Sequence, residues 1–169
     1  MNILTLDLAQ STGWAHSCGQ SGVQSFHPRR GDSPGMQFVE FQSWLRRFLD
    51  LQPTSLVVYE QAPTNRRNAA SVHIAHGYIS ALEMVQVERG FELTSRSVSA
   101  IKLFALPHIK KQSDRNKQQM VMYVENHWPS VRLPHRGDDD QADAIILLWM
   151  ILIEMGITDT EWHRRRVEY

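Results

Sequence analysis

Four acidic side chains stand where elements of the chain could bring them together. Asp7 lies near the end of the apolar segment NILTLDLA, and Glu60 near the end of SLVVYEQ; both segments have the length and composition of strands. Asp140 and Asp143 follow in RGDDDQADAIILLWMILIEMG, which predicts a helix from near Asp140 to near Gly156. In open α/β sheets, ligands bind beyond the carboxyl ends of the strands. The positions of Asp7 and Glu60 therefore suggest a site at that edge.

The spacing within the aspartate-rich segment leaves two interpretations open. Asp140 and Asp143 are three positions apart, so they share one helix face about one turn apart. Capping of the helix, with its favourable dipole interaction, explains one or two of Asp138, Asp139 and Asp140, but it does not explain Asp143 beside the apolar face. Crowded, partly buried carboxylates repel one another, and a cation would neutralise them.

Oxygen ligands without a nearby cysteine suit Mg²⁺, or Mn²⁺ in its place. Two such ions about 4 Å apart can activate a water and stabilise a leaving oxygen in phosphodiester hydrolysis. The acids Asp7, Glu60, Asp140 and Asp143 are therefore the candidate ligands of a metal site that could hydrolyse a phosphodiester.

The rest of the chain predicts an α/β fold. The expected strands cover residues 2–9, 11–19, 22–28, 55–61 and 91–99, and the first three suggest an antiparallel meander. The expected helices cover residues 35–51, 69–89, 100–106, 117–128 and about 140–156. Strands come first and then alternate with helices, as in α/β domains. We assign residues 1–156 to one domain and residues 157–169 to a polar tail, and Gly77 is typical of close helix packing.

Composition excludes several classes of protein. The 169 residues, 42% of them hydrophobic, indicate a folded chain with a real core. Cys18 is the single cysteine, which excludes an internal disulfide or a four-cysteine zinc site and fits a reducing compartment. The N-terminus lacks the basic region of a signal peptide, and the longest apolar run, ten residues from Ala144 to Ile153, is too short to span a bilayer. We expect a cytoplasmic protein without a membrane span.

Basic residues occur in clusters on a chain whose formal net charge is zero. The net charge gives no argument for nucleic acid, but local basic patches can bind phosphates. For any single pair, ordinary solvated charge is the competing explanation. The candidates for DNA contact are Arg66, Arg67, Lys110, Lys111 and Arg115.

The segments LTLDLAQSTGWA, VVYEQ and DDDQADAIILL occur in the order and at roughly the spacing seen in RuvC-like Holliday junction resolvases. The chain resembles most the variants carried by phages and prophages, over the region from Asp7 to about Leu148. The resemblance implies a ribonuclease H-like fold, with a mixed five-stranded sheet flanked by helices. It also implies that the family's catalytic, metal-binding acids correspond to Asp7, Glu60, Asp140 and Asp143.

Other positions match the family less closely. Lys102 in VSAIK and Lys117 in DRNKQQMV resemble lysines that the family places near the scissile phosphate, at a longer spacing than usual; a solvated lysine is the alternative for both. Asp139 could replace Asp140 if the helix starts earlier. The usual glycine two residues after the first aspartate is Ala9, which predicts a less permissive turn. The segment APTNRRN lacks the aromatic wedge residue of the family.

The resemblance implies an endonuclease that uses two Mg²⁺ ions to nick four-way DNA junctions symmetrically, leaving 5′-phosphate and 3′-hydroxyl ends. Symmetric cleavage requires two sites related by a two-fold axis, so a homodimer is expected. The helix at 69–89, with His73, Ile74, Tyr78 and Leu82, is its predicted interface. The alternatives are a nuclease of this fold that cuts flaps, forks or RNA–DNA hybrids, a silent branched-DNA scaffold, or an ATP-dependent sugar-kinase-like protein.

Overall fold

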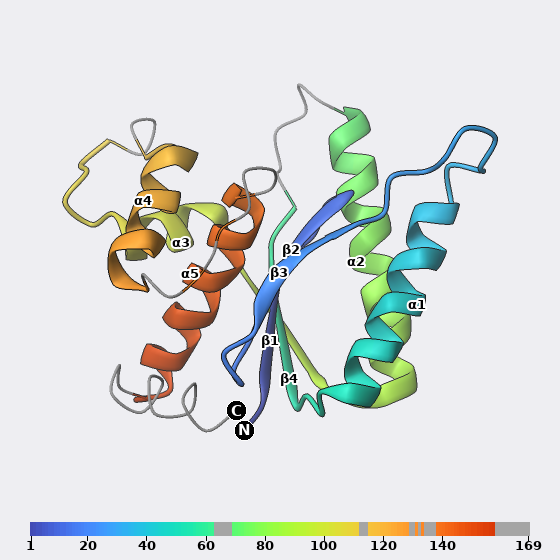
Figure 1. The fold of residues 1–169 in the computed structure, drawn as a ribbon, viewed down its shortest axis with the longest axis horizontal. Coiled ribbons are helices and arrows are strands. Elements are labelled where there is room, and N and C mark those ends of the chain that lie inside the picture. The colour runs from blue at the N-terminus through green and yellow to red at the C-terminus, as the bar shows by residue number, and fades with distance from the viewer. Residues whose placement is uncertain (63–68, 112–114, 129–130, 132, 134–137, 158–169) are drawn as a thin grey trace.

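The computed structural model describes residues 1–62, 69–111, 115–128, 131, 133 and 138–157, which form a central sheet with helices on both faces (Figure 1). The described strands are β1 (Ile3–Asp7), β2 (Ser11–His16), β3 (Ser21–Ser25), β4 (Leu56–Glu60) and β5 (Glu92–Arg96), in the order β3-β2-β1-β4-β5. The first three strands are antiparallel, and β1, β4 and β5 are parallel. The predicted meander and mixed five-stranded sheet are confirmed.

The described helices are α1 (Met36–Leu51), α2 (Ala69–Arg89), α3 (Val98–Ala105), α4 (Lys117–His127) and α5 (Asp138–Glu154). Helices α1 and α2 cover one face of the sheet; α5 covers the other, with α3 and α4 packed against α5 (Figure 1). Helix α5 begins at Asp138 rather than near Asp140, because acidic residues are favourable in a first helical turn.

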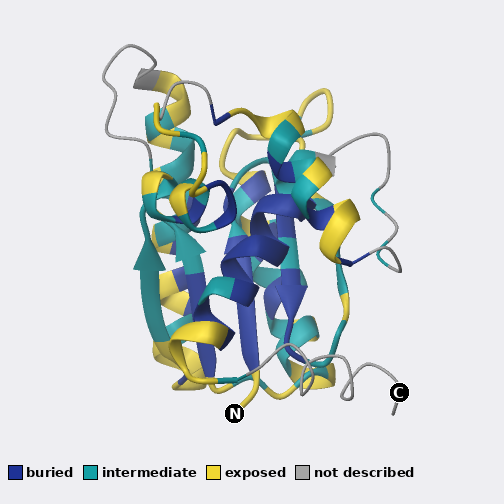
Figure 2. Cartoon of the chain, turned by 90° about the vertical axis from the view of Figure 1, so that its left-hand side faces the viewer, coloured by how far each residue is buried: buried dark blue, intermediate teal, exposed yellow. Residues whose placement is uncertain are grey.

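Helix α5 is enclosed between the sheet and the pair α3 and α4. Its residues 144–149 are each at most 6% exposed, and they share a core with Ile3 and Val58 of the sheet. Figure 2 shows this buried centre, with the exposed residues on the outer helices and loops. An all-apolar helix is expected where partners cover every side. Within the described ranges, no helix has the length and apolar character needed to cross a membrane.

The strands divide their side chains between two cores. On β1, Leu4 and Leu6 pack with α1 and α2, whereas Ile3 packs with α5. Because successive side chains of a strand point to opposite faces, Asp7 lies on the α5 side of the sheet. The same alternation along β4 places Glu60 on that side. The period of two thus directs both strand-borne acids toward the helix that carries the others.

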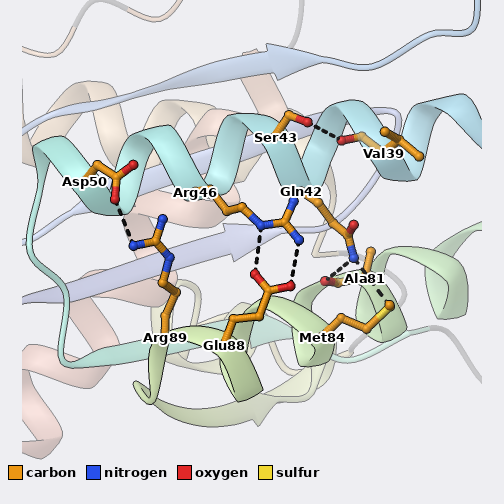
Figure 3. Close-up of polar contacts among 9 residues, drawn as sticks. All are labelled: Val39, Gln42, Ser43, Arg46, Asp50, Ala81, Met84, Glu88 and Arg89. Carbon is orange, nitrogen blue, oxygen red and sulfur yellow. Dashed lines mark hydrogen bonds and ion pairs between the residues drawn. The ribbon is translucent and has the colours of Figure 1, made fainter.

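Helices α1 and α2 are joined by a row of polar contacts along their exposed side (Figure 3). Arg46 donates through Nε and Nη2 to the two carboxylate oxygens of Glu88, at 2.8 and 2.9 Å, and Arg89 pairs with Asp50 at 2.9 Å. Exposed pairs of this kind contribute about 0–1 kcal/mol each. They favour the orientation of the two helices, while the apolar core beneath supplies most of the stability.

The expected dimer surface on α2 is wrong for two of its residues. Tyr78 and Leu82 are fully buried in the core that α2 shares with α1 and the sheet, so they cannot contact a second subunit. They are buried because α1 packs directly on this face of α2. The close packing predicted at Gly77 is confirmed, since a Cβ there would overlap the ring of Phe38.

Candidate active site

The carboxyl ends of β1 and β4 bring two acids side by side. The parallel register pairs Leu6 with Tyr59, so Asp7 and Glu60 follow one residue later on neighbouring strands. Such strands lie about 4.8 Å apart. Burial raises the pKa of Asp7 well above its usual value, and the charge of Glu60 raises it further. Asp7 and Glu60 therefore lie at the same edge of the sheet, as their positions at the strand ends indicated.

Helix α5 adds two more carboxylates to the same place. Asp143 is 8% exposed, and burial raises its pKa to about 6. Burial and the charge of Asp143 raise the pKa of Glu60 to about 7. The charges of Asp143 and Asp140 also raise the pKa of Asp7. The structure therefore gathers Asp7, Glu60, Asp140 and Asp143 into one cluster of mutually repelling groups, which we call the acidic cluster.

Asp139 is held differently from Asp140. Its carboxylate forms an ion pair with Lys117, whose Nζ lies 3.9 Å from Oδ1 of Asp140. The charge of Asp140 raises the pKa of both Asp7 and Glu60, and the charges of Asp139 and Asp140 both raise the pKa of Asp143. Asp140 therefore interacts electrostatically with the acids on β1 and β4, while Asp139 is paired with Lys117. Which of the two ligates a metal stays a prediction.

Two lysines bring positive charge to the acidic cluster. Lys102 on α3 and Lys117 on α4 both lower the pKa of Glu60 and of Asp143, against the larger opposite effect of burial. Burial lowers the pKa of Lys117 itself, but the hydrogen bond to Asp139 and the charges of the nearby aspartates together outweigh burial, so the pKa is raised. Both lysines therefore lie within electrostatic reach of the acids, and their role at a phosphate stays a prediction.

Helix caps position the two lysines. In α4, the side chain of Asn116 accepts a hydrogen bond from the backbone N–H of Gln119, and the Gln119 side chain accepts one from the N–H of Asn116, both at 3.0 Å. This reciprocal capping box fixes the start of the helix, and Lys117 is its first residue. Ser97 caps α3, the helix that carries Lys102, by accepting from a backbone N–H.

A glycine that the sequence analysis did not assign to the site allows the helix to reach the sheet. Gly13 lies opposite Asp7 in the β1–β2 register, and a Cβ on it would overlap the carbonyl group of Asp140. Gln141 adds a hydrogen bond from Nε2 to Oγ of Ser21 at 3.0 Å. The available signal was a glycine inside a predicted strand, which often marks close approach of another backbone.

The turn after Asp7 tolerates Ala9. None of the described residues other than glycine has a positive φ, so alanine introduces no left-handed strain here. The hydroxyl of Thr12 donates to the carbonyl oxygen of Ala9 at 2.7 Å and closes the turn between β1 and β2. The missing family glycine therefore leaves this edge of the site intact.

The residues expected to contact DNA differ in their placement. Arg66 and Arg67 lie outside the described residues. Lys110 and Lys111 are exposed in the segment that follows α3. Their contact with DNA stays a prediction.

Arg115 has an internal role. It is 9% exposed, and its guanidinium donates from Nε to the carbonyl of Leu106 at 3.2 Å and from Nη2 to the carbonyl of Ile109 at 2.5 Å. These bonds tie the segment after α3 to the start of α4. The burial of Arg115 disfavours direct contact with DNA. That contact was predicted from the charge of the side chain alone.

The acidic cluster matches a hard cation in chemistry but is not a closed cage. Within the described ranges, no three His, Cys, Asp or Glu side chains stand ready to hold a metal ion. The candidate metal ligands in the acidic cluster are all carboxylate oxygens. Among the described residues, Oδ1 of Asp143 is buried and has no hydrogen-bond partner. A buried carboxylate oxygen without a donor is costly, and a divalent cation would satisfy it. The residues therefore fit Mg²⁺ or Mn²⁺ as a donor set.

Comparison with solved structures identifies the fold. Thermus thermophilus RuvC in complex with a Holliday junction substrate superposes with a TM-score of 0.71 and 13% identity, covering 93% of this chain and 97% of that one. Thermus thermophilus RuvC gives 0.66 at 15% identity, covering 93% and 98%. The yeast mitochondrial Holliday junction resolvase Ydc2 gives 0.54 at 14% identity, covering 99% and 80%. No protein-family model and no curated protein matches the sequence. The chain has the ribonuclease H-like fold of RuvC, as predicted.

We expect Gly13→Ala to destabilise the protein because its methyl group would overlap the backbone of Asp140. Overpacking of this kind costs about 1–3 kcal/mol. Gly35→Ala is the control, since a Cβ there meets nothing nearer than Oγ of Ser33 at 3.8 Å. Urea unfolding of both variants measures the difference. Equal free energies of unfolding for the two variants would show that α5 does not depend on this contact.

Glu60→Gln should change how stability depends on pH in metal-free protein. Since the folded pKa of Glu60, about 7, exceeds the ordinary 4.5, the folded state binds more protons between these values and stability falls as pH rises. The stability of Glu60→Gln relative to wild type should therefore increase from pH 4.5 to pH 7. Urea unfolding across this range in EDTA gives the measurement.

The pH dependence of wild-type stability alone does not isolate Glu60, because His16 contributes in the opposite direction. Burial lowers the pKa of His16 to about 4, so the unfolded state binds more protons between about 4 and 6.5 and stability falls as pH falls there. The difference between wild type and Glu60→Gln removes this opposing contribution. A flat difference across the range would contradict the assignment of a raised pKa to Glu60.

Proposed function

We propose that this chain is a metal-dependent endodeoxyribonuclease that resolves four-way DNA junctions. The observation that carries the proposal is the acidic cluster, in which Asp7, Glu60, Asp140 and Asp143 meet at the carboxyl ends of two parallel strands on a RuvC-like fold. The structure of that fold with a Holliday junction substrate supports branched DNA as the ligand class. Phosphodiester hydrolysis is the chemistry that such an acidic site supports.

The four carboxylates of the acidic cluster would hold two Mg²⁺ ions, with Mn²⁺ able to replace them. When bound, the ions supply positive charge that activates water and stabilises the leaving oxygen. The unpaired Oδ1 of Asp143 and the raised pKa values of Asp7 and Glu60 both describe a site that lacks compensating charge. Cation binding would favour the ionised carboxylates and release any proton held by Glu60.

The lysines would act on the phosphate. Lys102 and Lys117 are within electrostatic reach of Glu60 and Asp143, so the same region offers carboxylates to cations and ammonium groups to an anionic substrate. An ammonium group near the scissile phosphate stabilises negative charge that develops during cleavage. Asp139 orients Lys117 through its ion pair. These lysines are thus proposed to bind the phosphate and not the metal.

Symmetric nicking of a junction would require two copies of the chain. A two-fold axis presents the same site to two equivalent strands, so we propose a homodimer. On the predicted interface helix α2, His73 is exposed and Ile74 is half-buried, whereas Tyr78 and Leu82 belong to the core. The interface would therefore use the exposed side of α2. The exposed Lys110 and Lys111 are proposed to contact the DNA backbone.

Cleavage of a labelled synthetic four-way junction in Mg²⁺ tests the proposal. Wild type should produce paired nicks at symmetric positions, and Asp7→Asn should lose them while still binding the junction, because only one carboxylate of the acidic cluster is removed. Asp50→Asn is the matched control, since Asp50 lies on the exposed side of α1, where it pairs with Arg89. Denaturing gels and gel-shift assays report the two properties separately.

The other outcomes identify the alternatives. Junction binding without cleavage in Mg²⁺ or Mn²⁺ would indicate a branched-DNA scaffold. Faster cleavage of flaps, forks or RNA–DNA hybrids than of junctions would indicate another nuclease on this fold. A chain that neither binds nor cuts any of these substrates would refute the proposed function and leave only the fold.

A further inference from the structure

Thr5 is a polar residue in the middle of the most central strand. It is fully buried on β1, two residues before Asp7, so both side chains lie on the face that α5 covers. A buried hydroxyl has to be hydrogen-bonded to offset its desolvation. Its neighbour on this face, Ile3, is apolar and belongs to the core around α5. The hydroxyl of Thr5 therefore needs a specific partner.

The hydroxyl of Thr5 finds that partner on the helix of the acidic cluster. Its Oγ1 lies 2.7 Å from the carbonyl oxygen of Ala144 and 3.1 Å from that of Ala15. A hydroxyl has one proton, and the shorter distance favours donation to Ala144. Ala144 directly follows Asp143. The bond therefore joins the strand that carries Asp7 to the helix residue next to Asp143.

The hydrogen bond from Thr5 to Ala144 has a preferred direction and length, which apolar packing lacks. Apolar burial is non-directional, so by itself it constrains the position of α5 along the sheet only loosely. A hydrogen bond has a preferred length and angle and fixes the two groups it joins. Gly13 and the bond from Gln141 to Ser21 place the first turn of α5 over β2 and β3, and Thr5 places the next turn over β1.

We propose that Thr5 is a positioning residue that sets the register of α5 against β1, and with it the placement of Asp143 relative to Asp7. The inference rests on the proposed nuclease function. A displacement of about 1 Å at a reacting centre can lower the rate about 100-fold. Thr5 acts through the acids and is not expected to touch DNA or metal.

Thr5→Val and Thr5→Ser separate the hydroxyl from the rest of the side chain. Valine keeps the branched shape and removes the hydrogen bond, while serine keeps the bond. We expect Thr5→Val to lower the turnover of junction nicking about 10- to 100-fold without weakening junction binding, and Thr5→Ser to remain within a few-fold of wild type. Thr54→Val is the control, because the hydroxyl of Thr54 bonds to Gln52 at the opposite end of β4.

If the valine variant does not fold, a second pair of variants, Thr5→Ala and Thr5→Ser, tests the same hydroxyl. Thr5→Ala and Thr5→Ser differ only in the hydroxyl, so nicking turnover should be lower for alanine. Wild-type turnover in Thr5→Val, or equal losses in the serine and alanine variants, would overturn the proposal.

Mn²⁺ binding without DNA separates this proposal from the nuclease function. Calorimetric titration should give weaker Mn²⁺ binding for Thr5→Val than for Thr5→Ser, because the acids on β1 and α5 are displaced relative to each other. If wild type cuts no DNA but shows this difference, the nuclease function fails and the positioning role stands. Equal Mn²⁺ binding by the two variants, or no Mn²⁺ binding by wild type, would overturn the positioning role.

Discussion

The structure depends on holding like charges together in a partly buried place, where their repulsion is stronger than in water. The acidic cluster is unfavourable by itself, as the raised pKa values of Asp7, Glu60 and Asp143 show. Its members stay together because they are attached to elements that are strongly buried elsewhere. Residues 144–149 of α5 and the inner residues of β1 and β4 supply that burial. Apolar packing thus offsets a repulsion that a bound cation would relieve.

Much of this arrangement could be predicted from local pattern. The positions of Asp7 and Glu60 near the ends of two apolar segments indicate a common edge of the sheet, and the parallel pairing of β1 and β4 brings these ends together. The three-residue spacing puts Asp140 and Asp143 on one side of α5. These inferences succeed because strand and helix periods are properties of the backbone and need no knowledge of the partners.

The features that sequence reasoning missed depend on long-range contacts. Gly13 is separated from Asp140 by most of the chain, and its role is visible only once the helix lies on the strand. Arg115 has the positive charge expected of a DNA contact, yet its guanidinium donates hydrogen bonds to backbone carbonyls inside the protein. Tyr78 and Leu82 follow the helical period of an interface but face α1. In each case the residue type permits two roles, and only tertiary packing decides between them.

The layered order of the helices separates the two signs of charge. The acids are carried by the sheet and by α5, whereas Lys102 and Lys117 are carried by α3 and α4, which pack on the far side of α5 (Figure 1). The outer layer packs on α5 through Ile101, Met120 and Val124, and the ion pair of Lys117 with Asp139 joins it to the helix that carries the acids. A change in the length or tilt of α3 or α4 would therefore alter the positive charge around the acidic cluster before it altered the strands that carry Asp7 and Glu60.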